Sequence, residues 1–353
     1  MKKYVILRTA MLLIWLVVIL GCSQNKVTHD HAIRLEGHTM GTTWHVTYLD
    51  SLRRDYRPDI QELLDTINNQ VSTYIDSSVI SRFNRTDTGI VLKFWQSTHP
   101  YFVVFMENLN KARKVWQASG GWFDPTIMPL VNYWGFGYTE KHPVVQVDSA
   151  VVDSLMRCIG MDKVHLRINQ DHAWLTKDLP CTQLDFSAIA KGYGVDAVCR
   201  LLDGFGITDY LVEIGGEVRS KGLSPRATPW LVGINTPDAD APATAIIAKL
   251  ALQDKALATS GNYRNFFEVE GRKYAHIISP KTGYPQTTDL LSVSVIADEC
   301  AFADAWATAF MAMGQEAAWQ KANQMGLEVY LIYGKKDGTF GIRYTDGFGQ
   351  LLK

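Results

Sequence analysis

The chain has 353 residues, and its 36 Asp and Glu residues nearly cancel its 35 Lys and Arg residues. A formal net charge of −1 gives no field that would attract nucleic acid or an acidic membrane surface, so we expect no nucleic-acid partner. The length suits one large domain or two.

The N-terminus contains the parts of an export signal. Lys2, Lys3 and Arg8 precede an unbroken apolar run over residues 9–20, which ends in Gly21-Cys22-Ser23. The run is too short for a typical membrane-spanning helix. Its junction, VILGC, resembles the lipobox at which bacterial lipoproteins are cleaved, leaving a lipidated cysteine as the first residue.

We therefore predict a signal peptide over residues 1–21, a lipid anchor at Cys22, a tether over residues 22–36 and a folded domain over residues 37–353. The acyl chains of such an anchor bury enough methylene groups for firm attachment. The protein is then exported and faces the periplasm, or another extracytoplasmic side of a bacterial membrane. The alternative is an ordinary signal anchor that is not cleaved.

The first half of the domain shows the periodicity of strands and that of helices. Residues 42–49 alternate between apolar and polar side chains, which is typical of a half-buried strand. Residues 59–75 carry apolar side chains at helical spacing, and Pro58 suits the first turn of a helix there. A second helix is expected over residues 101–118, ahead of two glycines.

The second half mixes strands and helices without a strict alternation of the two. Helices are predicted over residues 187–202 and 300–313, the latter ended by Gly314. Residues 235–245 are predicted to form a surface loop. Strands are predicted over residues 163–168, 210–218, 230–234, 246–251, 265–269, 292–297 and 329–333. This order favours an α+β fold in a single large domain.

The domain contains four cysteines, none at the spacing of a metal site. They are Cys158, Cys181, Cys199 and Cys300. Export permits disulfides, and four cysteines allow three pairings, but buried free thiols suit a chain of this length about as well.

Standard signatures for phosphate loops, dinucleotide folds, zinc proteases and serine hydrolases are absent from the sequence. Glycine-rich and polar clusters remain. Met40 beside Gly41 suits contact with a flat ring, although ordinary packing is the commoner explanation. Trp122 and Phe123 would wall a ring-binding slot or simply pack on the core, and Asp124 begins a turn.

Lys191 lies in the stretch LDFSAIAKGYGVD, six residues after Asp185. A helix that opens at Ser187 or Ala188 would place its free N–H groups beside this lysine, which suits a phosphate. On local grounds alone, a solvated lysine is the commoner explanation. The glycine pair at 215–216 interrupts a predicted strand and marks a bulge or the close approach of a ligand.

Asp304 and Thr308 are four residues apart, so they lie on one face of an alanine-rich helix. A carboxylate and a hydroxyl suit a hard cation such as Mg²⁺, with capping or surface exposure as the alternative. His276 is flanked by apolar residues, and a satisfied core histidine is its simplest explanation.

Eight stretches resemble, in order, the successive signature blocks of one family. They are HTMGTTW, SSVISRFN, GGWFDPTIMPLVNYWGFG, LDFSAIAKGYGVD, YLVEIGGEVRSKG, ATSGNYRNFF, YAHIISPKTGYP and DECAFADAWATAFMAMG. From about His38 to Gly314 the chain is similar to the ApbE family of FAD:protein FMN transferases. The resemblance implies an enzyme that splits FAD at its pyrophosphate with Mg²⁺, transfers the FMN half to a threonine or serine hydroxyl, and releases AMP.

The resemblance also implies roles for individual residues. His276 would be the base on the acceptor hydroxyl, and Lys191 would stabilise charge on the phosphoryl oxygens. The metal ligands would be the carbonyl of Ala188 with Asp304 and Thr308. The FAD contacts would be Met40, Tyr74, Trp122, Phe123, Asp124, Asp185, Lys191, His276 and Ile277. The acceptor would carry a Ser/Thr-Gly-Ala-Thr-type motif and is expected to be a membrane redox subunit.

One position departs from the family pattern, because Ser279 stands where an aspartate is expected after the histidine. This puts in doubt any electrostatic help from that aspartate. Two alternatives to transfer remain open at the level of sequence. The site would hydrolyse FAD to FMN and AMP if water replaced the acceptor, or the protein would bind flavin without turnover.

Overall fold

The computed structural model describes residues 31–93, 101–139, 147–238, 241–242, 244–262, 266–269, 272–275 and 277–353. The predicted signal peptide, the predicted lipid anchor at Cys22 and the predicted base His276 lie outside these residues. Within the described residues, no helix combines the length and the apolar character needed to cross a membrane.

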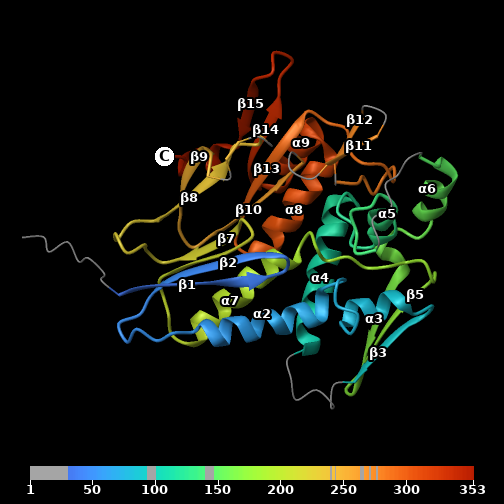
Figure 1. Cartoon of the computed structure of the whole chain (residues 1–353), viewed down its shortest axis with the longest axis horizontal. Helices are drawn as coiled ribbons and strands as arrows, with labels where there is room; N and C mark the ends of the chain where they lie inside the picture. The colour runs from blue at the N-terminus through green and yellow to red at the C-terminus, as the bar shows by residue number, and fades with distance from the viewer. Residues whose placement is uncertain are drawn as a thin grey trace, which may run out of the picture.

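An eight-stranded antiparallel sheet forms the centre of the molecule, in the order β1-β2-β6-β7-β10-β13-β14-β15 (Figure 1). Its strands are β1 (Ala32–Thr39), β2 (Thr42–Leu49), β6 (Tyr210–Ile214), β7 (Glu217–Lys221), β10 (Ala256–Gly261), β13 (Leu290–Ala297), β14 (Glu328–Gly334) and β15 (Phe340–Tyr344).

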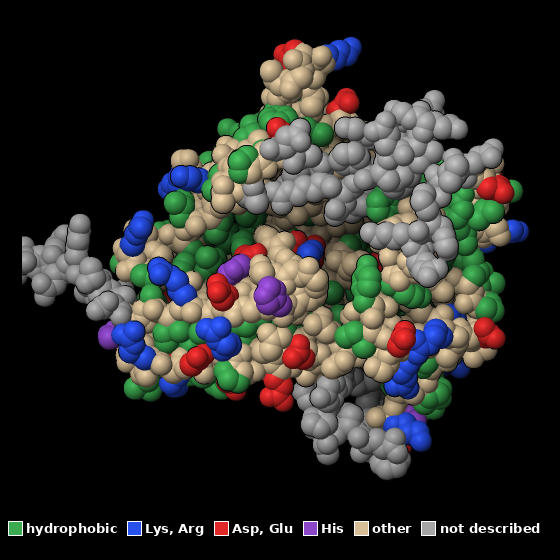
Figure 2. Space-filling model, in the orientation of Figure 1, with side chains coloured by type: hydrophobic (Ala, Val, Ile, Leu, Met, Phe, Trp, Pro, Cys, Tyr) green, Lys and Arg blue, Asp and Glu red, His purple; other side chains and the backbone are tan. Residues whose placement is uncertain are grey.

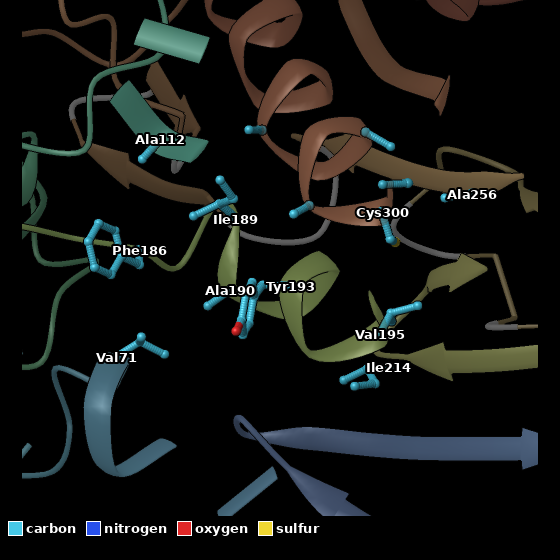
Figure 3. Packing of buried hydrophobic residues seen from close by; sticks show 14 of the residues in the cluster. Val71, Ala112, Phe186, Ile189, Ala190, Tyr193, Val195, Ile214, Ala256 and Cys300 are labelled. Carbon is cyan, nitrogen blue, oxygen red and sulfur yellow. The ribbon is translucent and has the colours of Figure 1, made fainter. Parts of the chain in front are cut away.

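Successive residues of these strands enter two different cores, as the period of a strand requires. Val295 and Leu331 point into the main core, whereas their neighbours Ile296 and Ile332 belong to a second cluster. The main core lies under four helices: α2 (Arg57–Val71), α4 (Tyr101–Ser119), α7 (Ala190–Gly204) and α8 (Cys300–Met313). Figure 3 shows side chains of α7, α8, β6 and β10 filling the space between these helices and the sheet.

The second cluster is covered by the hairpin β8 (Trp230–Asn235) and β9 (Ile246–Leu252) together with α10 (Asp346–Leu351). A separate sheet has the order β3-β5-β4. The remaining elements are α3 (Val79–Arg85), β3 (Gly89–Lys93), α5 (Met128–Tyr133), α6 (Ser149–Met156), η1 (Met161–Lys163), β4 (Val164–Ile168), β5 (His172–Lys177), β11 (Phe266–Val269), β12 (Arg272–Ala275) and α9 (Gln315–Met325).

The predicted α+β class in a single domain is confirmed. The strand over 42–49 and the helix over 300–313 have the predicted bounds, and Gly314 ends α8 with φ 79°. The segment between β8 and β9, predicted as a loop, contains no helix or strand among its described residues. The sequence left disulfides and buried free thiols as alternatives, and the structure contains both. Cys158 and Cys181 form a disulfide, whereas Cys199 and Cys300 are buried free thiols.

Four predictions differ from the structure by more than two residues, each for a local reason. The helix over 59–75 stops at Val71, because Ser72 has an extended backbone with ψ 121°. The helix over 187–202 begins only at Ala190, because the Asp185 carboxylate accepts hydrogen bonds from the Ser187 N–H and Oγ and holds a turn there.

The predicted strand over 210–218 is two strands, β6 and β7, since Gly215 and Gly216 have φ of 59° and 103° and form the turn between them. Finally, the boundary at residue 37 falls inside β1, whose residues pair with β2 from Ala32 onward. The folded part therefore begins earlier than predicted.

Candidate active site

Two cavities adjoin at the start of α7. The first, which we call the α8 cavity, has a volume of about 440 Å³ and is lined by Asp304 and Thr308 of α8. The second, the hairpin cavity, has a volume of about 560 Å³ and is lined by Met40 at the tip of the β1–β2 hairpin. Asp185, Ser187 and Lys191 line both cavities. The face in Figure 2 is hollowed near its middle, by the tip of this hairpin.

Lys191 is the second residue of α7 and lies at the junction of the cavities. Its Nζ is 3.1 Å from Glu217 Oε1 and 3.9 Å from Asp304 Oδ1. Burial acts to lower the pKa of Lys191, but the carboxylates of Asp304 and Glu217 outweigh it and raise the pKa above its usual value. The lysine is therefore a charged, ion-paired group in a cavity wall, and the solvated-surface alternative is wrong.

Glu217 follows the β6–β7 turn and is buried, with 3% of its surface exposed. One carboxylate oxygen accepts a hydrogen bond from Lys191, while the other has no hydrogen-bond partner among the described residues. Burial raises the pKa of Glu217, and the neighbouring ammonium of Lys191 opposes this shift.

Asp304 is 2% exposed, and the Gly192 N–H donates to its Oδ2 at 3.0 Å. In a regular helix the N–H of Gly192 would bond to the carbonyl of Ala188. Because it bonds to Asp304 instead, no described backbone N–H donates to the Ala188 carbonyl. Thr308 lies in the same cavity, with its Oγ1 3.1 Å from Ser260 Oγ.

The start of α8 is fixed from α7. The Asp196 carboxylate accepts hydrogen bonds from the N–H groups of Cys300 and Ala301, both at 2.9 Å, and it pairs with Arg219 Nη1 at 2.6 Å. A carboxylate is well placed at a helix N-terminus, where free N–H groups point outward. This contact sets the depth at which α8 presents Asp304 to the cavity.

The predicted metal ligands thus lie on one cavity, and their oxygen donors suit a hard cation. Within the described ranges, no group of three or more His, Cys, Asp and Glu residues is arranged to hold a metal. The predicted set of one carboxylate, one hydroxyl and one backbone carbonyl is compatible with that finding. The Ala188 carbonyl, which accepts no hydrogen bond from a described backbone N–H, fits the set as well.

Four of the predicted FAD contacts line the hairpin cavity: Met40, Tyr74, Asp185 and Lys191. Met40 and Gly41 form the β1–β2 turn with φ of 49° and 73°, and the first of these values is unusual for a residue with a side chain. Tyr74 is 73% exposed, and its ring meets that of Tyr138 edge-on with centroids 6.4 Å apart. Burial raises the pKa of Asp185, which faces both cavities.

The segment from Trp122 to Asp124 lies elsewhere. Phe123 is buried in the main core, and Trp122 packs against that core. The Asp124 carboxylate accepts hydrogen bonds from Trp116 Nε1 and from the Thr126 N–H and Oγ1. None of the three lines the α8 or hairpin cavity, so the structure does not bring them together with Lys191, and their contact with FAD stays a prediction.

The segment after His276 joins the α8 cavity through Ile277. Ser279, which replaces the expected aspartate, is buried, and its Oγ accepts a hydrogen bond from the Lys281 N–H. Its carbonyl accepts a second bond from the Gly283 N–H at 2.8 Å. Ser279 therefore closes a local turn, as aspartate side chains also do.

A model of the ApbE family matches residues 40–331, which is most of the chain. The chain belongs to the ApbE family. A FAD:protein FMN transferase of Haemophilus influenzae is 36% identical over 326 residues, covering 91% of this chain and 92% of that relative.

Solved ApbE structures have the same fold. The flavin transferase ApbE of Vibrio cholerae matches with a TM-score of 0.79 and 34% identity, over 91% of this chain and 99% of that chain. The flavinyl transferase ApbE of Pseudomonas stutzeri, in its apo form, matches with a TM-score of 0.78 and 31% identity, over 91% of this chain and 96% of that chain.

Two polar residues of the α8 cavity in this ApbE-family chain, Glu217 and Ser260, are among those that the sequence predictions missed. Glu217 and Ser260 lie in signature blocks, but neither was distinguishable from its neighbours by residue type or spacing. The one available signal was the glycine pair at 215–216, because a tight hairpin turn carries the residue after it back into the sheet beside the preceding strand. That signal identifies the hairpin, but it does not reveal that Glu217 pairs with the ammonium of Lys191.

Proposed function

We propose that the protein transfers the FMN half of FAD to a threonine or serine hydroxyl of an acceptor protein and releases AMP. FAD has two halves joined by a pyrophosphate, and the site has two cavities joined at Lys191. This junction is the observation that carries the proposal. Family membership and the FAD:protein FMN transferase name of the Haemophilus relative support the same reaction.

In the proposed reaction the acceptor oxygen forms a bond to the phosphorus of the FMN half. The bond from that phosphorus to the bridging oxygen breaks, and the bridging oxygen leaves with AMP. The acceptor hydroxyl loses its proton, which we assign to His276 on the family resemblance, since a histidine with a pKa near neutrality suits a general base.

Lys191 would stabilise the negative charge that grows on the phosphoryl oxygens. Its ammonium is already in place at the junction, held by Glu217 and near Asp304, so little reorganisation is needed when a phosphate binds. Asp185, between the cavities, and Met40 and Tyr74, in the hairpin cavity, would position FAD.

We also propose that Mg²⁺ is required, with Asp304, Thr308 and the Ala188 carbonyl as its protein ligands. When bound, the ion would neutralise phosphate charge. The support is the chemistry of the three oxygen donors on one cavity.

We further propose that the acceptor carries a Ser/Thr-Gly-Ala-Thr-type motif in a membrane redox subunit, and that Cys22 anchors the protein by lipid on the extracytoplasmic side. The support for the anchor is the VILGC junction after a short apolar run. Cells grown with labelled palmitate should label the wild type but not the Cys22→Ala variant. A wild type that takes up no palmitate and keeps residues 1–21 would favour the uncleaved signal anchor.

Incubation with FAD, Mg²⁺ and an acceptor protein carrying the motif tests the reaction. Transfer gives flavin fluorescence on the acceptor in a denaturing gel together with AMP. AMP without a labelled acceptor identifies a hydrolase instead, and bound FAD with no AMP identifies a flavin-binding protein without turnover.

A further inference from the structure

We propose that Glu217 is a positioning residue for Lys191, and that its carboxylate holds the lysine ammonium where the α8 and hairpin cavities meet. The inference rests on the proposed function, in which Lys191 contacts the pyrophosphate of FAD. Glu217 itself would not touch the substrate.

The relative burial of the two groups supports this division of roles. The Lys191 side chain is 29% exposed and the Glu217 side chain only 4% exposed, so the lysine is the more accessible of these two residues of the α8 cavity. An ammonium has three N–H donors. Glu217 accepts from Lys191 at 3.1 Å, and Asp304 lies 3.9 Å away, so at least one donor is left for a ligand.

The same hairpin also supports the stem of the lysine. A Cβ on Gly215 would lie 3.4 Å from Lys191 Cδ and 2.8 Å from Thr42 Cγ2, so the turn is in close contact with both. The Gly216 N–H donates to Glu213 Oε1 at 2.6 Å, which fixes this turn. The β6–β7 hairpin thus contacts Lys191 along its stem and at its charged end.

The carboxylate of Glu217 balances the charge of the mostly buried Lys191 ammonium, whose other ion-pair partner among the described residues, Asp304, is 3.9 Å away. Its Oε2 is buried and has no hydrogen-bond partner among the described residues, so the fold does not fully satisfy this carboxylate. A charge kept in this unfavourable setting beside a cavity lysine is what a functional role for the charge predicts.

A double-mutant cycle tests the inference, with Glu217→Gln, Lys191→Met and the combined variant of the full protein. FAD affinity is measured by flavin fluorescence in all four proteins, and the acceptor-labelling rate and Tm are measured beside it. Glu316→Gln is the matched control, because it removes an exposed carboxylate that pairs with Arg343.

We expect Glu217→Gln to lower the labelling rate and FAD affinity by about tenfold or more, in a variant whose Tm stays above the assay temperature. In the Lys191→Met background the same change should alter FAD affinity by less than about twofold, since coupled residues are not additive. The control should match the wild type in all three measurements.

Equal effects of Glu217→Gln on FAD affinity in both backgrounds would overturn the inference. A wild-type rate in Glu217→Gln refutes the inference alone and leaves the proposed function standing. Wild-type protein that labels no acceptor refutes the proposed function, and the inference falls with it.

Discussion

Replacing Gly192 with alanine should damage both the stability and the activity of the protein. Gly192 lies where α7 crosses the start of α8, and a Cβ there would lie 2.4 Å from the Cys300 carbonyl oxygen and 2.8 Å from Ala301 Cα. Ordinary contact begins at 3.4 Å, so the helices would have to separate by about 1 Å. Both clashing groups are backbone, which cannot rotate away.

The expected magnitude follows from two opposing effects. Overpacking of this kind costs up to about 3 kcal/mol, while alanine is favoured over glycine in a helix by about 1 kcal/mol. We therefore expect a net loss of about 2 kcal/mol in the free energy of unfolding. The same displacement moves the Gly192 N–H away from Asp304, so the transfer rate should fall by about a hundredfold, as a 1 Å misplacement can cause.

Urea unfolding and acceptor labelling measure the two effects. Gly204→Ala is the matched control, because it is the last residue of the same helix and a Cβ there meets nothing within 4 Å. That variant should keep full activity and be equally stable or slightly more so. If Gly192→Ala were as stable and active as Gly204→Ala, the close packing of α7 on α8 would be refuted.

Three further predictions concern single side chains. Asp304→Ala should abolish transfer, by at least about a hundredfold, while near-UV circular dichroism shows a folded domain; normal turnover would remove the metal assignment. His276→Ala should retain FAD binding, measured by fluorescence, but lose about a hundredfold or more in transfer rate, and an unchanged rate would mean that another group is the base. Lys177 is buried against three backbone carbonyls, and burial lowers its pKa from 10.5 to about 8. Between these two pH values the lysine is protonated in the unfolded chain and largely deprotonated in the folded protein. The free energy of unfolding of the wild type relative to Lys177→Met should therefore rise with pH across that window, by on the order of 2–3 kcal/mol in urea titrations, and a flat or falling difference would contradict the burial of a charged lysine.

The parts of the fold with strong local patterns were predictable from sequence. The strand at 42–49 alternates cleanly, and α8 has a long apolar sequence ended by a glycine, so both have the predicted bounds. Strand β10 carries two alanines, a serine and a glycine, which show no strand pattern, and only pairing with β13 and β7 makes it a strand.

The start of α7 shows the limit of local patterns more closely. Its apolar spacing is helical from Ser187, but the side chain of Asp185 bonds to Ser187 and holds a turn that propensity does not reveal. Because α7 begins only at Ala190, the Ala188 carbonyl lies outside its regular i to i+4 hydrogen bonds, and Lys191 lies in its first turn.

The residues of the site divide in the same way. Asp304 and Thr308 follow from helical spacing, since both face one cavity. The partners of Lys191 do not, because Glu217 is 26 residues away and Asp304 is further still along the chain. Such contacts depend on the order of strands in the sheet, which no short motif encodes.

The most direct test of the proposed function is the labelling of an acceptor protein. Incubated with FAD, Mg²⁺ and an acceptor carrying the Ser/Thr-Gly-Ala-Thr-type motif, the protein should produce covalently flavinylated acceptor and AMP in equal amounts. An acceptor that stays unlabelled while AMP accumulates, or no AMP at all, would contradict the assignment of FMN transfer.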